Sequence, residues 1–137
     1  MRKLHPINWL GIAFLAAFVI WAVGMTALVA QPSSRCLSLE LTPRYVMRVI
    51  DGDTFILFAI ATPPEERIRV LGVDTPERGS GPLADSATAF TTRWLAAGNF
   101  SLNACKRDSF GRLLAHVTRA GQDLADTLIV LKLGVPK

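Results

Sequence analysis

The sequence predicts a small domain of mixed α and β structure, mainly strands with two helices, preceded by one amino-terminal transmembrane helix. Three observations support this: a long uncharged apolar run near the start, five short runs rich in β-branched and apolar residues, and a stretch with helical periodicity. The chain has 137 residues and a formal charge of +4, and 50% of it is hydrophobic. Setting the apolar run aside leaves the composition of an ordinary soluble domain, which excludes a disordered chain, a collagen and a polytopic membrane protein.

The apolar run covers residues 9–30 and contains no charged side chain. As a helix it would reach about 33 Å, enough to cross a hydrocarbon core of about 30 Å. The run is longer than the apolar region of a cleaved signal peptide, and Leu28 lies where cleavage after the run would need a small residue. We therefore expect an uncleaved signal anchor, with secretion after cleavage as the alternative. Arg2 and Lys3 favour a cytoplasmic location for residues 1–8.

The segment after the anchor divides into a linker and a domain. Residues 31–43 are expected to be the linker and residues 44–137 the domain. Five runs of β-branched and apolar residues, separated by turn signals, predict strands at 45–50, 54–59, 67–73, 100–105 and 113–118.

Two helices are expected among these strands. The first covers 82–97, where four apolar residues recur at helical spacing, with Pro82 in the first turn and Gly98 just past the end. The second covers 124–131 and is capped by Asp123. Five short strands with a helix after the third suggest a small closed barrel of the OB type, a fold that binds oligonucleotides on a strand face and its bordering loops.

Polar residues that could bind a ligand or take part in catalysis gather in three places along the chain. The first is 51–54, Asp-Gly-Asp-Thr, which as structure alone is a hairpin turn signal. The second is 69–77, where an arginine, two carboxylates and a hydroxyl crowd one strand end. Burying these groups would be costly without partners, and a hard divalent cation with a phosphate would satisfy all of them. The third is the turn 108–112 with Arg112, and a lone arginine in a turn is usually a solvated charge.

Together, the three motifs resemble the staphylococcal nuclease (thermonuclease) family. The motifs are Val-Ile-Asp-Gly-Asp-Thr at 49–54, Arg-Val-Leu-Gly-Val-Asp-Thr-Pro-Glu at 69–77 and Asp-x-Phe-Gly-Arg at 108–112, around a helix that carries Ala89 and Phe90. The resemblance runs from Tyr45 to the end of the chain. It implies a calcium-dependent phosphodiesterase on a five-stranded OB-type barrel that acts on DNA and RNA with little sequence preference.

The resemblance also implies a role for each site residue. Asp53 and Asp74 would bind Ca²⁺ through their carboxylates and Thr75 through its backbone carbonyl. Asp51 would support these ligands from outside. An all-oxygen donor set suits calcium better than zinc, in agreement with the resemblance.

The remaining matches concern the substrate. Glu77 matches the residue that holds or deprotonates the attacking water. Arg69 and Arg112 match the two guanidinium groups that grip the scissile phosphate, and a planar cation with several donors suits that task. Ser109 and Phe110 depart from the best-known member, which has a lysine and a tyrosine there, so we expect weaker binding of short nucleotides. The carboxyl-terminal stretch 128–137 fits the family only loosely, and truncation of the domain at that end stays open as an interpretation.

The two cysteines, Cys36 and Cys105, are the last candidates. In the barrel that the resemblance implies, the start of the first strand lies near the end of the fourth, so we expect a disulfide between them. Two unpaired buried thiols are the alternative.

These predictions combine into a single-pass protein of a bacterial inner membrane whose endonuclease domain lies in the periplasm. Its expected partners are DNA and RNA substrates and the lipid bilayer around residues 9–30. The main alternative is a non-catalytic OB-fold nucleic-acid-binding module on a membrane anchor. A third reading is a structural membrane protein that neither cleaves nor binds nucleic acid.

Overall fold

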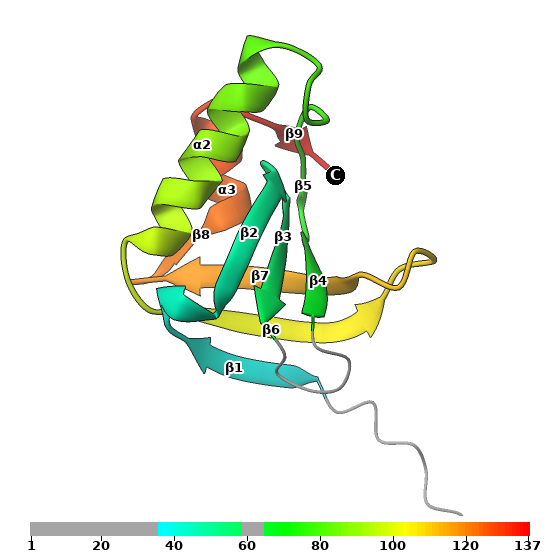
Figure 1. Ribbon diagram of the computed structural model, residues 1–137, viewed down its shortest axis with the longest axis vertical. Helices are drawn as coiled ribbons and strands as arrows, with labels where there is room; N and C mark the ends of the chain where they lie inside the picture. Colours follow the sequence, from blue (N-terminus) through cyan, green and yellow to red (C-terminus); the bar gives the residue numbers. More distant parts are fainter. Residues whose placement is uncertain (1–35, 59–64) are drawn as a thin grey trace, which may run out of the picture. The chain divides into compact units, whose positions relative to one another are not determined.

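The computed structural model describes residues 36–58 and 65–137. The described part is a mixed α+β domain with two α-helices (Figure 1). Its elements are β1 (Leu37–Leu41), the 3-10 turn η2 (Pro43–Tyr45), β2 (Val46–Asp51), β3 (Thr54–Phe58), β4 (Glu65–Val70), β5 (Val73–Asp74), α2 (Pro82–Ala96), β6 (Phe100–Arg107), β7 (Leu113–Arg119), β8 (Gln122–Asp123), α3 (Leu124–Val130) and β9 (Val135–Pro136).

The predicted α+β class with two helices is confirmed. The predicted transmembrane helix at 9–30 lies outside the described residues. Within 36–58 and 65–137, neither helix has the length and apolar character needed to cross a bilayer.

The main sheet follows the order β1-β6-β7-β4-β3-β2, with β8 added to β7. Its pairs are antiparallel except for β4 and β7, which are parallel with Arg69 opposite Leu114. The two ends of this path, β1 and β2, follow each other in the chain and are joined through η2. A separate two-stranded sheet pairs β5 with β9.

The linker prediction for residues 31–43 is wrong over β1. Leucines alternate there with Ser38 and Glu40, a period-two pattern typical of a strand, and Leu37 pairs with Ala104 of β6. The predicted strand 67–73 is also interrupted, because the chain turns at Gly72 with φ of +87° before β5 begins.

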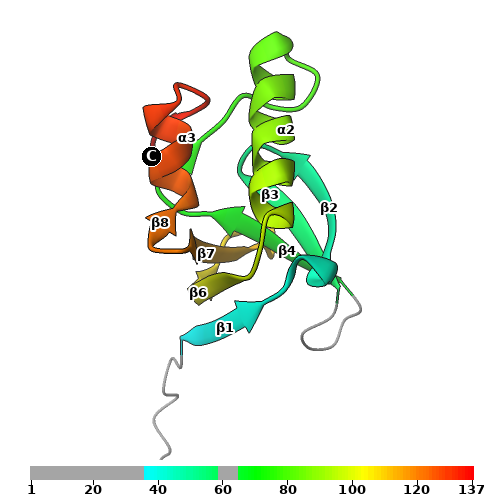
Figure 2. The same cartoon turned by 90° about the vertical axis from the view of Figure 1, so that its left-hand side faces the viewer.

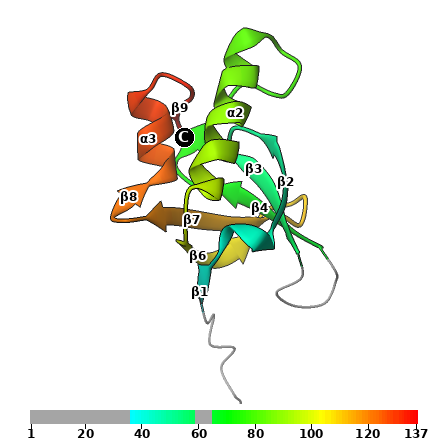
Figure 3. The ribbon, with the colours of Figure 1, turned by 60° about the vertical axis from the view of Figure 1, so that its left-hand side comes forward.

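The two helices lie on the same side of the sheet (Figures 2 and 3). Helix α2 buries Trp94 and Leu95 in the core beside Phe55 and Phe100, as its apolar periodicity predicted. Helix α3 starts where predicted, because the Asp123 carboxylate accepts hydrogen bonds from the backbone N–H groups of Ala125 and Asp126. The packing of α2 on the core places this helix against the turn between β2 and β3, where the site begins.

Candidate active site

The turn between β2 and β3 is pinned against helix α2. The hydroxyl of Thr91 on α2 donates to the Gly52 carbonyl at 2.6 Å. A Cβ at Gly52 would lie 2.7 Å from Ala87 Cβ and 2.8 Å from Thr75 Cγ2, closer than such atoms approach. The glycine is therefore required for this close approach, beyond any requirement of the hairpin turn. The contact sets the positions of Asp51 and Asp53 on either side.

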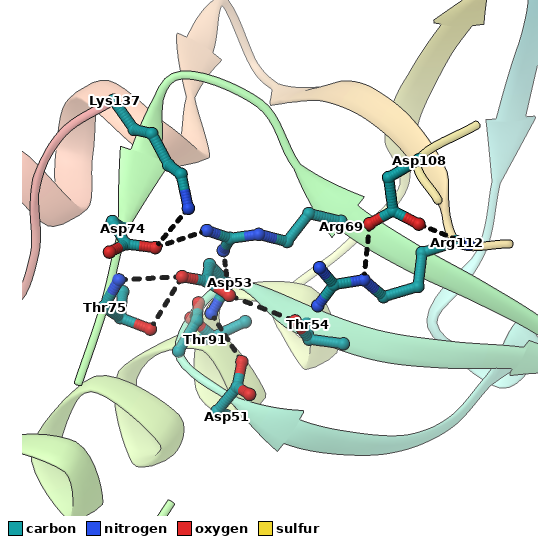
Figure 4. A network of polar contacts seen from close by, with 11 residues as sticks. Asp51, Asp53, Thr54, Arg69, Asp74, Thr75, Thr91, Asp108, Arg112 and Lys137 are labelled. Carbon is teal, nitrogen blue, oxygen red and sulfur yellow. Dashed lines mark hydrogen bonds and ion pairs between the residues drawn. The ribbon is translucent and has the colours of Figure 1, made fainter. Parts of the chain in front are cut away.

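Asp53 is the buried centre of a polar network (Figure 4), with 4% of its surface exposed. Its Oδ1 accepts a hydrogen bond from the Thr54 hydroxyl at 3.0 Å and forms an ion pair with Arg69. Its Oδ2 accepts from the backbone N–H and the hydroxyl of Thr75 at 2.7 and 3.0 Å. Both oxygens of this carboxylate are thus held by groups from β3, β4 and the chain after β5.

Arg69 bridges two carboxylates. Besides its ion pair with Asp53, its Nη2 donates to Asp74 Oδ1 at 2.6 Å. Burial alone would lower the pKa of Arg69, but the hydrogen bond and charge of Asp53, followed by Asp74, raise it above its ordinary value. Because Thr54 is registered opposite Arg69, the ladder between β3 and β4 brings this guanidinium beside Asp53.

Asp74 also receives a second cation that the sequence did not indicate. Lys137 Nζ donates to the same Oδ1 at 3.0 Å. This hydrogen bond, followed by the charges of Lys137 and Arg69, outweighs partial burial and lowers the pKa of Asp74.

Asp51 is the least compensated carboxylate of the network. It is 8% exposed, and its Oδ1 accepts from the backbone N–H of Asp53 at 3.2 Å. Burial, followed by the negative charge of Asp53, raises the pKa of Asp51 to about 6. Within the described residues, Asp51 has no cationic partner comparable to those of Asp53 and Asp74.

We expect Asp51→Asn to stabilise the calcium-free protein at neutral pH by about 2 kcal/mol. The folded state holds the Asp51 proton more tightly than the unfolded state, so stability falls as pH rises from 3.8 to about 6. Below pH 3.8 the variant and the parent should unfold alike. Urea unfolding in chelator, at neutral pH and below pH 3.8, measures the stability of both proteins. The control is Glu65→Gln, which removes an exposed carboxylate on β4. Equal stability of Asp51→Asn and its parent at neutral pH would contradict the expectation.

The turn 108–112 presents the second arginine. Asp108 Oδ2 accepts from Arg112 Nε at 2.8 Å, and Oδ1 accepts from the backbone N–H groups of Arg112 and Phe110 at 2.9 and 3.0 Å. Within the described part of the chain, the Nη groups of Arg112 have no hydrogen-bond acceptor. Arg69 and Arg112 line one pocket of about 340 Å³ together with Lys137. The two arginines and the lysine thus give this pocket a positively charged lining.

A third arginine ties this turn to β4. Arg107 donates through Nη1 and Nη2 to the two carboxylate oxygens of Glu66 at 2.6 and 2.8 Å, and through Nη1 to the Gly111 carbonyl at 2.9 Å. The pair joins the strand of Arg69 to the turn of Arg112. The sequence gives no signal for this pair, because the two residues are 41 positions apart and each resembles an ordinary surface charge.

The structure brings together most of the predicted site residues, but not all of them. Asp51, Asp53, Arg69, Asp74 and Thr75 form the network described above. Arg112 shares the pocket with Arg69.

Glu77 is exposed, and its side chain makes no hydrogen bond or ion pair with another described residue. Its backbone carbonyl instead accepts from the N–H and hydroxyl of Ser80 at 3.0 and 2.6 Å. Cys36 and Cys105 are joined by a disulfide between the start of β1 and the end of β6, the pairing expected above.

The donors at the network fit a hard cation. Across 36–58 and 65–137, no three acidic, histidine or cysteine side chains converge as a metal cluster. The donor set predicted from the sequence, however, consists of only two carboxylates and the backbone carbonyl of Thr75. Asp53 and Asp74 meet at one guanidinium, and Asp51 adds a third carboxylate at the same turn. Oxygen donors with this charge suit calcium.

Residues 67–134, which carry Arg69, Asp74, Thr75, Glu77 and Arg112, match the family described as "Staphylococcal nuclease homologue". The domain belongs to this staphylococcal-nuclease-like family. The chain is also similar to the thermonucleases of Staphylococcus intermedius and Staphylococcus hyicus, each 38% identical over 79 residues. Each match covers 53% of the chain and 46% of the relative, so the chain spans about half the length of these thermonucleases.

Proposed function

We propose that this nuclease-like chain is a calcium-dependent endonuclease that hydrolyses phosphodiester bonds of DNA and RNA with little sequence specificity. The observation that carries the proposal is the shared pocket of Arg69 and Arg112 beside the buried carboxylate network. Two guanidinium groups at one pocket suit a phosphodiester, because each guanidinium can donate two parallel N–H hydrogen bonds to its non-bridging oxygens. The likeness to two thermonucleases points the same way.

The residues divide the work as follows. Arg69 and Arg112 bind the non-bridging phosphate oxygens and stabilise the charge that builds there as water attacks phosphorus. Asp108 orients Arg112 through its hydrogen bond to Nε, which leaves the Nη groups for the phosphate. Glu77 accepts a proton from the attacking water while the P–O bond to the leaving strand breaks, and the sugar oxygen of that strand takes up a proton from solvent.

Calcium would be held by the carboxylates of Asp53 and Asp74 and the carbonyl of Thr75. When bound, it supplies Lewis-acid polarisation of the phosphate. Asp51 fixes the backbone of Asp53 through its hydrogen bond to the Asp53 N–H group. The fold that holds these groups is an OB-type barrel: the successive strands β1 and β2 form both ends of the sheet path, as one bent strand closing a barrel would.

The chain is further proposed to be anchored in a bacterial inner membrane by residues 9–30, with its nuclease domain in the periplasm. The uncharged length of 9–30 supports the anchor. The disulfide supports an oxidising compartment, because structural disulfides are rare in the cytosol. Secretion after signal cleavage would place the domain in an oxidising environment as well.

A non-catalytic OB-fold nucleic-acid-binding module is the second candidate. One observation favours it: the exposed Glu77 side chain makes no hydrogen bond or ion pair with the described network. Such a module would keep the cationic pocket and bind nucleic acid without cutting it.

The test is cleavage of a single-stranded DNA and a single-stranded RNA oligonucleotide by the full chain, in calcium and then in chelator. We expect cleavage in calcium only, and a loss of about 10²- to 10⁴-fold in kcat for Glu77→Gln, the range for a general base. Glu65→Gln, another exposed carboxylate, should cleave like the parent. A folded parent protein that binds the DNA in calcium without cleaving it would establish the binding module instead.

A further inference from the structure

The Asp74 carboxylate carries two cations on one oxygen (Figure 4). Arg69 Nη2 lies 2.6 Å and Lys137 Nζ 3.0 Å from Asp74 Oδ1. Arg69 is buried and also bound to Asp53, whereas 65% of the Lys137 side chain is exposed. Of the two partners of Asp74, the lysine is therefore the one that is free to leave.

Backbone contacts fix the place of Lys137. Strand β9 pairs with β5 so that Asp74 is registered opposite Val135. The backbone N–H of Lys137 donates to the Gly72 carbonyl at 3.2 Å. The small sheet thus holds the lysine backbone beside the pocket, while its side chain has four methylene groups on which to move.

Lys137 also lines the pocket of Arg69 and Arg112. From this backbone position its ammonium group can reach either of two anions, the Asp74 carboxylate or a phosphate in the pocket. The only side-chain carboxylate among the described residues that line this pocket belongs to Asp108, which is engaged by Arg112. A phosphate in the pocket would therefore have three cationic side chains around it and no unpaired acidic side chain.

We propose that Lys137 is a shared cation that neutralises Asp74 in the calcium-free protein and moves to the substrate phosphate when calcium binds Asp74. The inference rests on the proposed function, which makes Asp74 a calcium ligand. A divalent cation on Asp74 repels the ammonium group at short range, and the negative charge of a substrate phosphate in the adjacent pocket attracts it. Calcium binding and phosphate binding are then coupled through one side chain.

The proposal predicts that removing Lys137 changes calcium affinity in the direction opposite to that expected from a purely structural role. If the contact between Lys137 and Asp74 only latched β9 to β5, removing the lysine would loosen Asp74 and weaken calcium binding. If Lys137 competes with calcium for Asp74, removing it strengthens calcium binding. Coupling between two ligands is also reciprocal, so the same substitution must reduce the effect of calcium on phosphate binding.

The experiment compares the full chain with Lys137→Gln and with Lys106→Gln, which removes an exposed charge on β6. Titration calorimetry first measures calcium alone, and then thymidine 5′-monophosphate with and without calcium. For Lys137→Gln we expect calcium affinity to rise about two- to fivefold, the range for loss of an exposed competing ion pair. Affinity for the nucleotide in calcium should fall about fivefold or more, as for a lost charge-assisted hydrogen bond.

The outcomes separate this inference from the proposed function. Tighter calcium binding together with weaker nucleotide binding, for Lys137→Gln and not for Lys106→Gln, supports the shared cation. Calcium binding that is unchanged or weaker in Lys137→Gln overturns the inference while the calcium site stands. A parent protein that binds no calcium overturns the proposed calcium site and the inference with it.

Discussion

Arg69→Met should abolish cleavage and destabilise the calcium-free protein by about 3 to 5 kcal/mol, the usual cost of leaving a buried charge without its partner. The substitution removes a guanidinium that is 7% exposed and leaves Asp53, which is 4% exposed, without its ion-pair partner. Asp74 keeps Lys137 as a cation, so the penalty arises mainly at Asp53. Urea unfolding in chelator measures the stability, and cleavage of single-stranded DNA in calcium measures the activity.

Arg67→Met is the matched control. Arg67 lies two residues earlier on β4 and is exposed, so its loss should change stability little and leave cleavage intact. Calcium should restore part of the stability of Arg69→Met, because a cation bound at Asp53 replaces the missing charge and binding stabilises the folded state. Equal stability of Arg67→Met and Arg69→Met in chelator would show that Arg69 is not the compensating charge of the network.

The sequence predicted the helices well because their signals are local. The first helix was expected at 82–97 and is observed at Pro82–Ala96, starting at a proline and ending before a glycine. The second was expected at 124–131 and is observed at Leu124–Val130, starting at the Asp123 cap. Both depend on residues within one or two turns of each end, which a single sequence displays.

Strands that depend on distant partners were predicted less well. Strand β1 is mostly exposed, and its residues pair with β6 at separations of 59 to 67 positions, so its short leucine alternation alone does not distinguish it from a linker. Strands β5 and β9 have two residues each and exist through their pairing with each other. No local pattern of two residues separates such a strand from a loop.

The same distinction between local signals and long-range contacts applies to the site residues. Asp53 and Arg69 were predictable candidates, because an Asp-Gly-Asp turn and an arginine at a strand end are visible in the sequence and the β3–β4 ladder joins them. The contact of Lys137 with Asp74 was not, since it spans 63 positions and depends on β9 lying beside β5. The close packing of Gly52 against Ala87 likewise depends on tertiary structure alone.

The disulfide joins segments that are 69 positions apart, and its loss should lower the free energy of unfolding by about 2 to 4 kcal/mol. We expect this for the double variant Cys36→Ala with Cys105→Ala, because the unfolded chain regains the freedom that the cross-link removes. Strand β1 is the element most affected, since it forms one end of the sheet path and, among the described strands, pairs only with β6.

Among the described residues, the network around Asp53 includes none from β1 or β6. Strand β6 supports the turn of Arg112 through Arg107, whose contacts do not involve either cysteine, so cleavage at low temperature should continue in the double variant. Urea unfolding of the full chain measures the stability of the oxidised parent, the reduced parent and the double variant. Reductant should bring the parent close to the variant and leave the variant unchanged, because the chain has two cysteines and both are in the cross-link. A reductant-insensitive parent, or a double variant as stable as the oxidised parent, would show that the cross-link does not stabilise the fold. A large loss would instead tie the stability of the domain to an oxidising compartment, and thereby to its proposed place outside the cytoplasm.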